Sequence, residues 1–171
     1  MSDSTPRRRN LLFLATAAVI IVLDQLTKAW VKANLALGES LPASGFFRLE
    51  HTQNTGASFG MFQGSVHILA VFSAVGALVA LFLGLYLSRR VPFLQKSLNL
   101  ISLGLVLGGT LGNFIDRAFI GYVTDFLKAG PWPNFNIADS ATVVGGIWLA
   151  VSLIRYVSVE ESGAKPHPAQ P

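Results

Sequence analysis

Four long apolar stretches limit what this chain can fold into. They cover about residues 11–31, 66–87, 97–117 and 137–157. A helix of about 20 apolar residues is about 30 Å long, which matches the hydrocarbon thickness of a bilayer. Charged residues make up 13% of the chain, against about 25% in an ordinary soluble domain. The sequence therefore predicts an all-α membrane protein with four transmembrane helices.

The first apolar stretch has a second interpretation. Its uninterrupted apolar part covers residues 11–23, and Arg7, Arg8 and Arg9 precede it. A basic segment followed by a short apolar one is also typical of a secretory signal peptide. We favour a helix that continues through residue 31, because the three later apolar stretches need the first one as a packing partner.

The segments outside the apolar stretches define the rest of the organisation. Residues 34–63 contain FFRLEHT (46–52), whose partial alternation favours a strand. We expect a small β-rich cradle there, between the first and second helices. Residues 118–133 are expected to form a loop. The membrane domain then covers residues 11–157, with irregular tails at residues 1–10 and 158–171.

The basic residues predict how the chain crosses the membrane. Eight lie in the N-terminal tail, the 88–96 loop or the C-terminal end, and five lie in the other loops and helix ends. Cytoplasmic segments carry the excess of lysine and arginine. We therefore place both termini in the cytoplasm and the cradle outside. This clustering indicates topology and no nucleic-acid partner.

Four aspartates gather at the outer side in this topology: Asp24, Asp116, Asp125 and Asp139. Ionisable groups at membrane depth are costly, so each is a functional candidate. Asp24 and Lys28 lie four residues apart on one helical face and can pair. An alternative is an interfacial pair whose lysine extends to the lipid headgroups.

Three more polar groups lie close to these aspartates in sequence. Asn113, Asp116 and Arg117 share one face where the third helix ends, if that helix continues. Asn136 and Asp139 share a face where the fourth helix begins. Ahead of Asn113, glycines recur at positions 104, 108 and 112. Such a small-residue stripe indicates close helix packing in lipid.

Two neighbouring carboxylates can carry out peptide hydrolysis. In a low dielectric they share one proton, which leaves one base to activate water and one acid to protonate the leaving amine. The spacing leaves Asp116 and Asp125 as equal candidates for one member of such a pair. A structural ion-pair network, a proton-coupled carrier, a channel subunit or an assembly factor would explain the same acids.

The sequence gives little indication of a metal site or of a catalytic thiol. The chain has no cysteine and three scattered histidines, and it contains no HExxH motif and no serine–lysine signature. We therefore expect no metal and no cofactor.

Five short motifs occur in one order along the chain: DQLTK (24–28), NTGASF (54–59), GNFIDR (112–117), VTDF (123–126) and FNIADS (135–140). Together they resemble the bacterial lipoprotein signal peptidases, also called signal peptidase II. With the apolar stretches, the resemblance covers about residues 11–157. Ser58 stands where many members carry alanine.

The resemblance implies an aspartic peptidase with four helices in the bacterial inner membrane, and we expect it to be a monomer. Its substrates would be prolipoproteins, cut before a diacylglyceryl-modified cysteine, and its surroundings membrane lipid. The family's catalytic pair corresponds to Asp125 and Asp139. Supporting or substrate-binding roles would then fall to eight residues: Asp24, Lys28, Asn54, Gly56, Asn113, Asp116, Arg117 and Asn136.

Four of these interpretations assign contacts to particular side chains. Asn54 is expected to touch the substrate backbone, with a plain turn at Asn54–Gly56 as the alternative. Arg117 is expected to brace the supporting acids. Trp132 and Phe59 are expected to contact lipid beside the carboxylates.

Overall fold

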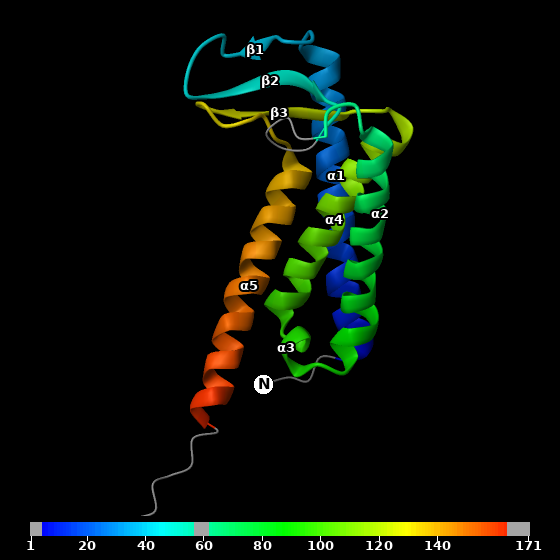
Figure 1. The fold of residues 1–171 in the computed structure, drawn as a ribbon, viewed down its shortest axis with the longest axis vertical. Coiled ribbons are helices and arrows are strands. Elements are labelled where there is room, and N and C mark those ends of the chain that lie inside the picture. The colour runs from blue at the N-terminus through cyan, green and yellow to red at the C-terminus, as the bar shows by residue number, and fades with distance from the viewer. Residues whose placement is uncertain (1–4, 57–61, 164–171) are drawn as a thin grey trace, which may run out of the picture.

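Four long helices stand side by side and a small sheet lies across one end of them (Figure 1). This is a computed structural model, and it describes residues 5–56 and 62–163. The long helices are α1 (Pro6–Asn34), α2 (Val66–Leu81), α4 (Ser97–Phe119) and α5 (Ile137–Gly163). A π-helical turn, Phe82–Tyr86, and a 3-10 turn, Leu87–Arg89, extend α2 toward the short helix α3 (Pro92–Gln95).

The described part of the chain has four helical segments that are long and apolar enough to cross a membrane: Pro6–Asn34, Val66–Arg89, Ser97–Phe119 and Ile137–Val159. Their outer faces expose large apolar side chains such as Phe72, Leu78 and Ile147. Water does not favour such faces, whereas lipid does. The prediction of an all-α membrane protein with four spans is confirmed.

Two helix boundaries differ from those expected. Helix α1 begins at Pro6, inside the predicted tail of residues 1–10, and α5 continues to Gly163, inside the predicted tail of residues 158–171. Over these residues the predicted tails are wrong. Proline fits the first turn of a helix because it lacks only an N–H that has no helical partner there.

The sheet is antiparallel with strand order β1–β2–β3. Strands β1 (Ser40–Leu41) and β2 (Phe47–Asn54) come from the predicted cradle, and β2 contains most of the expected strand. Strand β3 (Val123–Ala129) lies inside residues 118–133, so the predicted loop is wrong there. Buried Thr124 and Asp125 interrupt the apolar alternation that reveals a strand. The cradle therefore recruits its third strand from between α4 and α5.

Helix α4 is the centre of the bundle and packs against α1, α2 and α5. A Cβ added at Gly104 or Gly108 would lie 2.7 Å from the carbonyl oxygen of Phe13 or Ala17 on α1. The predicted close-packing stripe is confirmed. At Gly112 the added Cβ would lie 2.6 Å from Asp24 Oδ2. The same stripe thus brings α4 against the buried acids.

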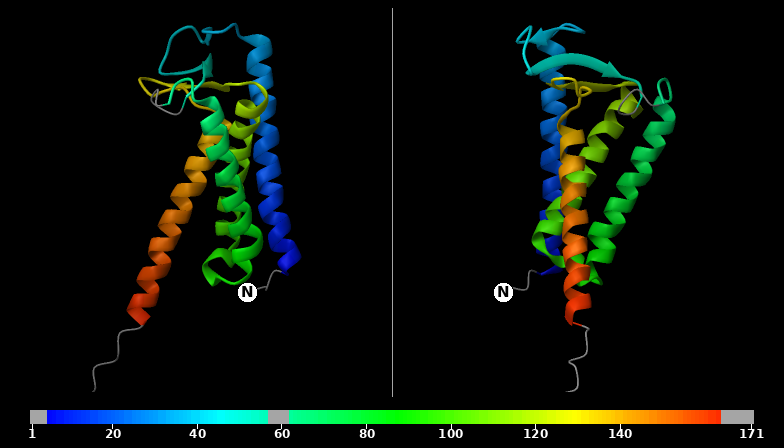
Figure 2. Two further views of the ribbon diagram at one scale, coloured as in Figure 1. Left: turned by 45° about the vertical axis from the view of Figure 1, so that its right-hand side comes forward. Right: turned by 60° about the vertical axis from the view of Figure 1, so that its left-hand side comes forward.

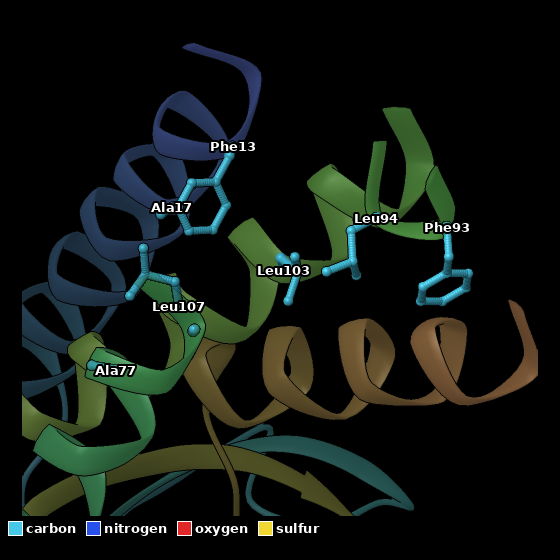
Figure 3. Close-up of a cluster of buried hydrophobic side chains, with 8 residues drawn as sticks. Phe13, Ala17, Ala77, Phe93, Leu94, Leu103 and Leu107 are labelled. Atoms are coloured by element: carbon cyan, nitrogen blue, oxygen red, sulfur yellow. The ribbon is translucent and has the colours of Figure 1, made fainter. Parts of the chain in front are cut away.

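The main apolar core lies toward the end of the bundle that carries α3. It joins α1, α2, α3 and α4 through Phe13, Ala17, Ala77, Ala80, Phe93, Leu94, Leu103 and Leu107 (Figure 3). The buried charged side chains of Asp24, Lys28, Asp116 and Asp125 lie instead near the sheet, where α1, α4, β3 and α5 meet (Figures 1 and 2). Among the described residues, the buried ion pairs therefore lie at the sheet end of the bundle.

Candidate active site

Asp139 is fixed where α5 begins. Its backbone N–H donates to Asn136 Oδ1 at 2.9 Å, and its Oδ2 accepts from the backbone N–H of Asn136 at 3.2 Å. This reciprocal pair is a capping box, which satisfies helix-start donors that have no partner within the helix. A carboxylate is also favoured there by the helix dipole. The spacing of Asn136 and Asp139 thus specifies both the start of the helix and the position of the carboxylate.

Asp125 reaches the same place from β3. Its Oδ1 accepts from Asn136 Nδ2 at 2.7 Å, and its Oδ2 accepts from Asn54 Nδ2 at 2.9 Å. Asn136 therefore bonds to both Asp125 and Asp139. Asn54 in turn accepts from the backbone N–H of Gly56 at 2.9 Å, in the turn that follows β2. Asn54 is thus held on a carboxylate and in a turn at the same time.

Burial raises the pKa of Asp125 to about 7, and the charge of Asp139 contributes to the increase. The hydrogen bonds from Asn54 and Asn136 act in the opposite direction, because they stabilise the ionised carboxylate. Near neutral pH Asp125 therefore exists in both protonation states. A carboxyl group of this kind can both accept and donate a proton.

A buried ion network lies beneath this pair. Lys28 Nζ is 2.7 Å from Asp24 Oδ2 and 3.1 Å from Asp116 Oδ2, and all three side chains are at most 1% exposed. The predicted pairing of Asp24 with Lys28 is confirmed. Because the ammonium is fully buried, the alternative in which Lys28 extends to the headgroups is wrong. A lysine between two acids balances charge that would be costly if left unpaired.

Each acid of this network bonds to the backbone beside one member of the pair. Asp116 Oδ2 accepts from the N–H of Thr124 at 3.1 Å, and Thr124 precedes Asp125. Asp24 Oδ1 accepts from the N–H of Ala138 at 3.0 Å, just before Asp139 in the chain. The two candidates that spacing left equal differ in their contacts: Asp116 bonds within the ion network, whereas Asp125 bonds to Asn136, as Asp139 does.

Asn113 connects the network to the pair. Its Oδ1 accepts from Lys28 Nζ at 3.0 Å, and its Nδ2 donates to Asp139 Oδ1 at 2.7 Å. The lysine therefore fixes the orientation of the Asn113 amide, and the amide fixes Asp139.

Arg117, which was expected to brace the acids, acts on Asp116, Asp125 and Asp139 only through longer-range charge interaction. No salt bridge to it occurs in the described part of the chain. Its Nη1 donates to Ser73 Oγ and its Nη2 to the carbonyl oxygen of Gly56, each at 3.4 Å. Arg117 thus ties α4 to α2 and to the turn after β2.

Three residues that were not singled out from the sequence complete the site. Gln25 Nε2 donates to Asp24 Oδ2 and Asp116 Oδ1, each at 3.2 Å. Thr52 Oγ1 donates to the carbonyl oxygen of Asp125 at 3.0 Å and accepts from Asn134 Nδ2 at 3.1 Å. The sequence did contain a signal for Gln25, because it is a polar residue between Asp24 and Lys28 in an apolar helix. Thr52 offered none, because it meets Asp125 only through the pairing of β2 with β3.

A cavity of about 480 Å³ adjoins the pair on its α5 side. Asp139 lines it together with Trp132, Phe135, Val143 and Val144. An apolar cavity that ends at a carboxylate can hold a lipidic or apolar chain next to the reacting groups. Trp132 therefore lies where lipid contact was expected, and Phe59 lies outside the described residues.

No three histidine, aspartate or glutamate side chains are grouped as metal ligands among residues 5–56 and 62–163. What the site offers is two carboxyl groups, those of Asp125 and Asp139, that both bond to Asn136. Two such carboxyl groups at one end of four membrane-length helices are the arrangement that an integral-membrane aspartic peptidase requires.

Comparisons with known proteins place the chain more narrowly. The family model described as signal peptidase (SPase) II matches residues 16–155. The lipoprotein signal peptidase of Dehalococcoides mccartyi is 46% identical over 155 residues, covering 91% of this chain and 95% of that protein. The lipoprotein signal peptidase of Moorella thermoacetica is 39% identical over 155 residues, covering 90% of this chain and 99% of that protein. The chain therefore belongs to the signal peptidase II family.

Two solved structures have the same fold. Both are bacterial membrane enzymes determined by the in meso method, one at 2.3 Å and one at 1.9 Å resolution. The first has a TM-score of 0.73 and 23% identity, covering 92% of this chain and 94% of that one. The second has a TM-score of 0.70 and 26% identity, covering 82% of this chain and 91% of that one.

Family membership confirms the resemblance seen in the motifs. The chain is a multi-pass membrane protein and an aspartic peptidase whose family processes prolipoproteins. The interpretations of the same acids as a carrier, a channel subunit or an assembly factor are thereby wrong.

Proposed function

We propose that Asp125 and Asp139 form the catalytic pair that cuts the peptide bond before a diacylglyceryl-modified cysteine in prolipoproteins. The observation that carries this assignment is the shared Asn136, which bonds to both carboxyl groups at the polar end of the bundle. The pKa of about 7 for Asp125 supports a pair that holds one proton at neutral pH.

The reaction follows from that single proton. The ionised carboxylate takes a proton from water as the water oxygen attacks the carbonyl carbon of the scissile bond. The protonated carboxyl then gives its proton to the amide nitrogen as the carbon–nitrogen bond breaks. The pair ends with one proton, as it began. Asn54 and Asn136 hold Asp125 throughout, and Asn113 holds Asp139.

The remaining family positions support this pair without reacting. Asp24, Lys28 and Asp116 locate the two backbone segments that carry the aspartates. Arg117 and Gly56 hold the turn after β2 against α2. Asn54 bonds to Asp125, which makes it a positioning residue and supports this role over contact with the substrate backbone.

The lipid of the substrate fits the cavity beside Asp139. Its walls include Trp132, Val143 and Val144, which face the membrane side of α5. Burying one CH₂ group is worth about 0.8 kcal/mol, so acyl chains supply substantial binding energy. Such energy, remote from the reacting bond, also aligns that bond with the carboxylates.

Charge placement supports the rest of the assignment. The basic excess lies at the end away from the sheet, so the proposed topology has cytoplasmic termini and an extracytoplasmic catalytic pair in the bacterial inner membrane. We also propose a monomer as the active form.

A direct cleavage assay tests the function. The purified protein is incubated with a diacylated prolipoprotein and with its unlipidated counterpart, and the products are identified by mass spectrometry. We expect one cut, before the lipidated cysteine, in the first substrate only. Cleavage of both substrates at equal rates would contradict the proposal that the enzyme recognises the lipid. Cleavage at another bond would contradict the proposed cleavage site.

A further inference from the structure

A second cavity lies at the opposite end of the bundle from the carboxylate pair. It has a volume of about 320 Å³ and lies between the C-terminal half of α5 and Lys96, where α4 begins. In Figures 1 and 2, α5 diverges from the other helices toward this end. Arg155, on its rim, follows Asp139 by 16 positions, which is about 24 Å along a helix. The cavity is therefore separate from the active site.

One wall of this cavity is held in place by buried hydrogen bonds. Trp148 Nε1 donates to Asn99 Oδ1 at 3.1 Å, and Asn99 Nδ2 donates to the carbonyl oxygen of Phe93 at 2.8 Å. Asn99 is only 1% exposed. Because the indole N–H is already bonded, the ring of Trp148 presents a fixed apolar surface to the cavity.

Two positively charged side chains also line this cavity. Lys96 lines the cavity, and its Nζ lies 5.4 Å from the centre of the Tyr156 ring, a cation–π contact. The Tyr156 ring packs against Phe93 at 5.6 Å between centroids, and Phe93 points toward α5 in Figure 3. Arg155 adds a second cation, and the described residues that line the cavity include no acid. The cavity thus combines two cations with apolar walls.

We propose that this cavity binds an anionic phospholipid. The phosphate would lie between Lys96 and Arg155, and an acyl chain would run along Trp148 and Val159 on the outer face of α5. A small soluble anion would leave the apolar walls without a partner. A zwitterionic headgroup would bind less favourably, because its own ammonium would be repelled by the two cations. The bound lipid would therefore join α5 to the corner formed by α3 and α4.

Lipid titration followed by native mass spectrometry tests the site. The intact protein in neutral detergent is titrated with dioleoyl phosphatidylglycerol and, separately, with dioleoyl phosphatidylcholine. The double variant Lys96→Gln, Arg155→Gln should bind the anionic lipid more weakly by on the order of tenfold, because each cation near a headgroup contributes to attraction. The matched control is Arg7→Gln, Arg8→Gln, which removes the same charge from the exposed start of α1 at the same end.

A second variant separates the cavity from the charge. Ser152→Phe fills the space and leaves both cations in place, so it too should weaken binding of the anionic lipid. Equal weakening in the Arg7 and Arg8 control would overturn the proposal in favour of general surface attraction. Equal affinity for the two lipids would overturn it as well. Displacement of the lipid by millimolar glycerol phosphate would show a free-anion site and no lipid site.

Discussion

Asp24 of α1 accepts a hydrogen bond from the backbone N–H of Ala138, 3.0 Å away and 114 positions later in the chain. Ala138 immediately precedes Asp139, so a buried acid of the first helix locates a proposed catalytic carboxylate on the last. Asp116 and Thr124 repeat the relationship beside Asp125. Lys28 holds both acids. One ion network therefore fixes the two halves of the site relative to each other.

Replacing Lys28 should destabilise the protein strongly. Lys28→Met leaves Asp24 and Asp116 buried and uncompensated, which should lower the free energy of unfolding by about 3–5 kcal/mol. Thermal unfolding in detergent measures the change. Lys32→Met, at an exposed position of the same helix, is the control and should leave the melting temperature unchanged. Adding Asp24→Asn and Asp116→Asn to Lys28→Met should restore part of the loss, and no recovery would contradict the role of charge balance.

Either member of the aspartate pair should be indispensable. Asp125→Asn or Asp139→Asn keeps the side-chain volume but removes a proton acceptor, so the cleavage rate should fall by about 100- to 10,000-fold. The double variant should be little worse, because the pair acts as a unit. Glu50→Gln on β2 is the control and should cleave normally. Near-normal cleavage by Asp125→Asn would transfer the assignment to Asp116.

The dependence of kcat/KM on pH should follow Asp125. With a pKa of about 7 for this carboxyl, activity should decline as the pH rises above about 7, because the pair then loses its shared proton. The hydrogen bond from Asn54 lowers this pKa, so Asn54→Ala should move the alkaline limb of the profile to higher pH. Gln53→Ala, on the exposed side of β2, should leave the limb in place. A limb that Asn54→Ala does not move would contradict the assignment.

Stability should depend on pH through the same group. The folded-state pKa of Asp125 is raised from 3.8 to about 7, so the folded state binds more protons than the unfolded state between these values. The contribution of this group is fully present below about pH 4 and is lost as the pH rises through about 7. Asp125→Asn should flatten this decline in melting temperature. An unchanged decline in the variant would place its origin elsewhere.

The cavity beside Asp139 should affect substrate binding more than chemistry. Val144→Asn makes one wall polar and should raise KM for a diacylated substrate about tenfold, because burying a valine side chain is worth about 1.5 kcal/mol. The value of kcat should change little. Val157→Asn, an exposed position further along α5, is the matched control. A loss confined to kcat would argue that Val144 orders the carboxylates.

The topology can be tested with a reporter that is active only outside the cytoplasm. Fused at Gly45, between β1 and β2, it should be active. Fused at Pro92, in the basic connection between α2 and α4, it should be inactive. The reverse pattern would move the proposed catalytic pair to the cytoplasmic side.

The spans and the local motifs were open to prediction from the sequence because they depend on short-range physics. Apolar runs of membrane length specify helices whatever their neighbours, and Asn136 three residues before Asp139 specifies a capped helix start. The glycine stripe of α4 likewise implied close packing. The five motifs indicated the family before any contact was known.

Other features depended on contacts between distant segments. β3 was missed for two reasons. Its partner β2 lies about 70 positions earlier in the chain. Thr124 and Asp125 are polar residues at buried positions, so the strand lacks the alternation of apolar and polar residues that predicts a strand. Spacing alone left Asp116 and Asp125 as equal candidates, and the resemblance to the family favoured Asp125 without showing any contact. Only the packing of α1 against α4 put Asp116 on Lys28, and only the pairing of β2 with β3 brought Asp125 to Asn54 and Asn136. Local propensity determines which elements form, whereas the contacts across them decide which carboxylate joins the ion network and which bonds to Asn136.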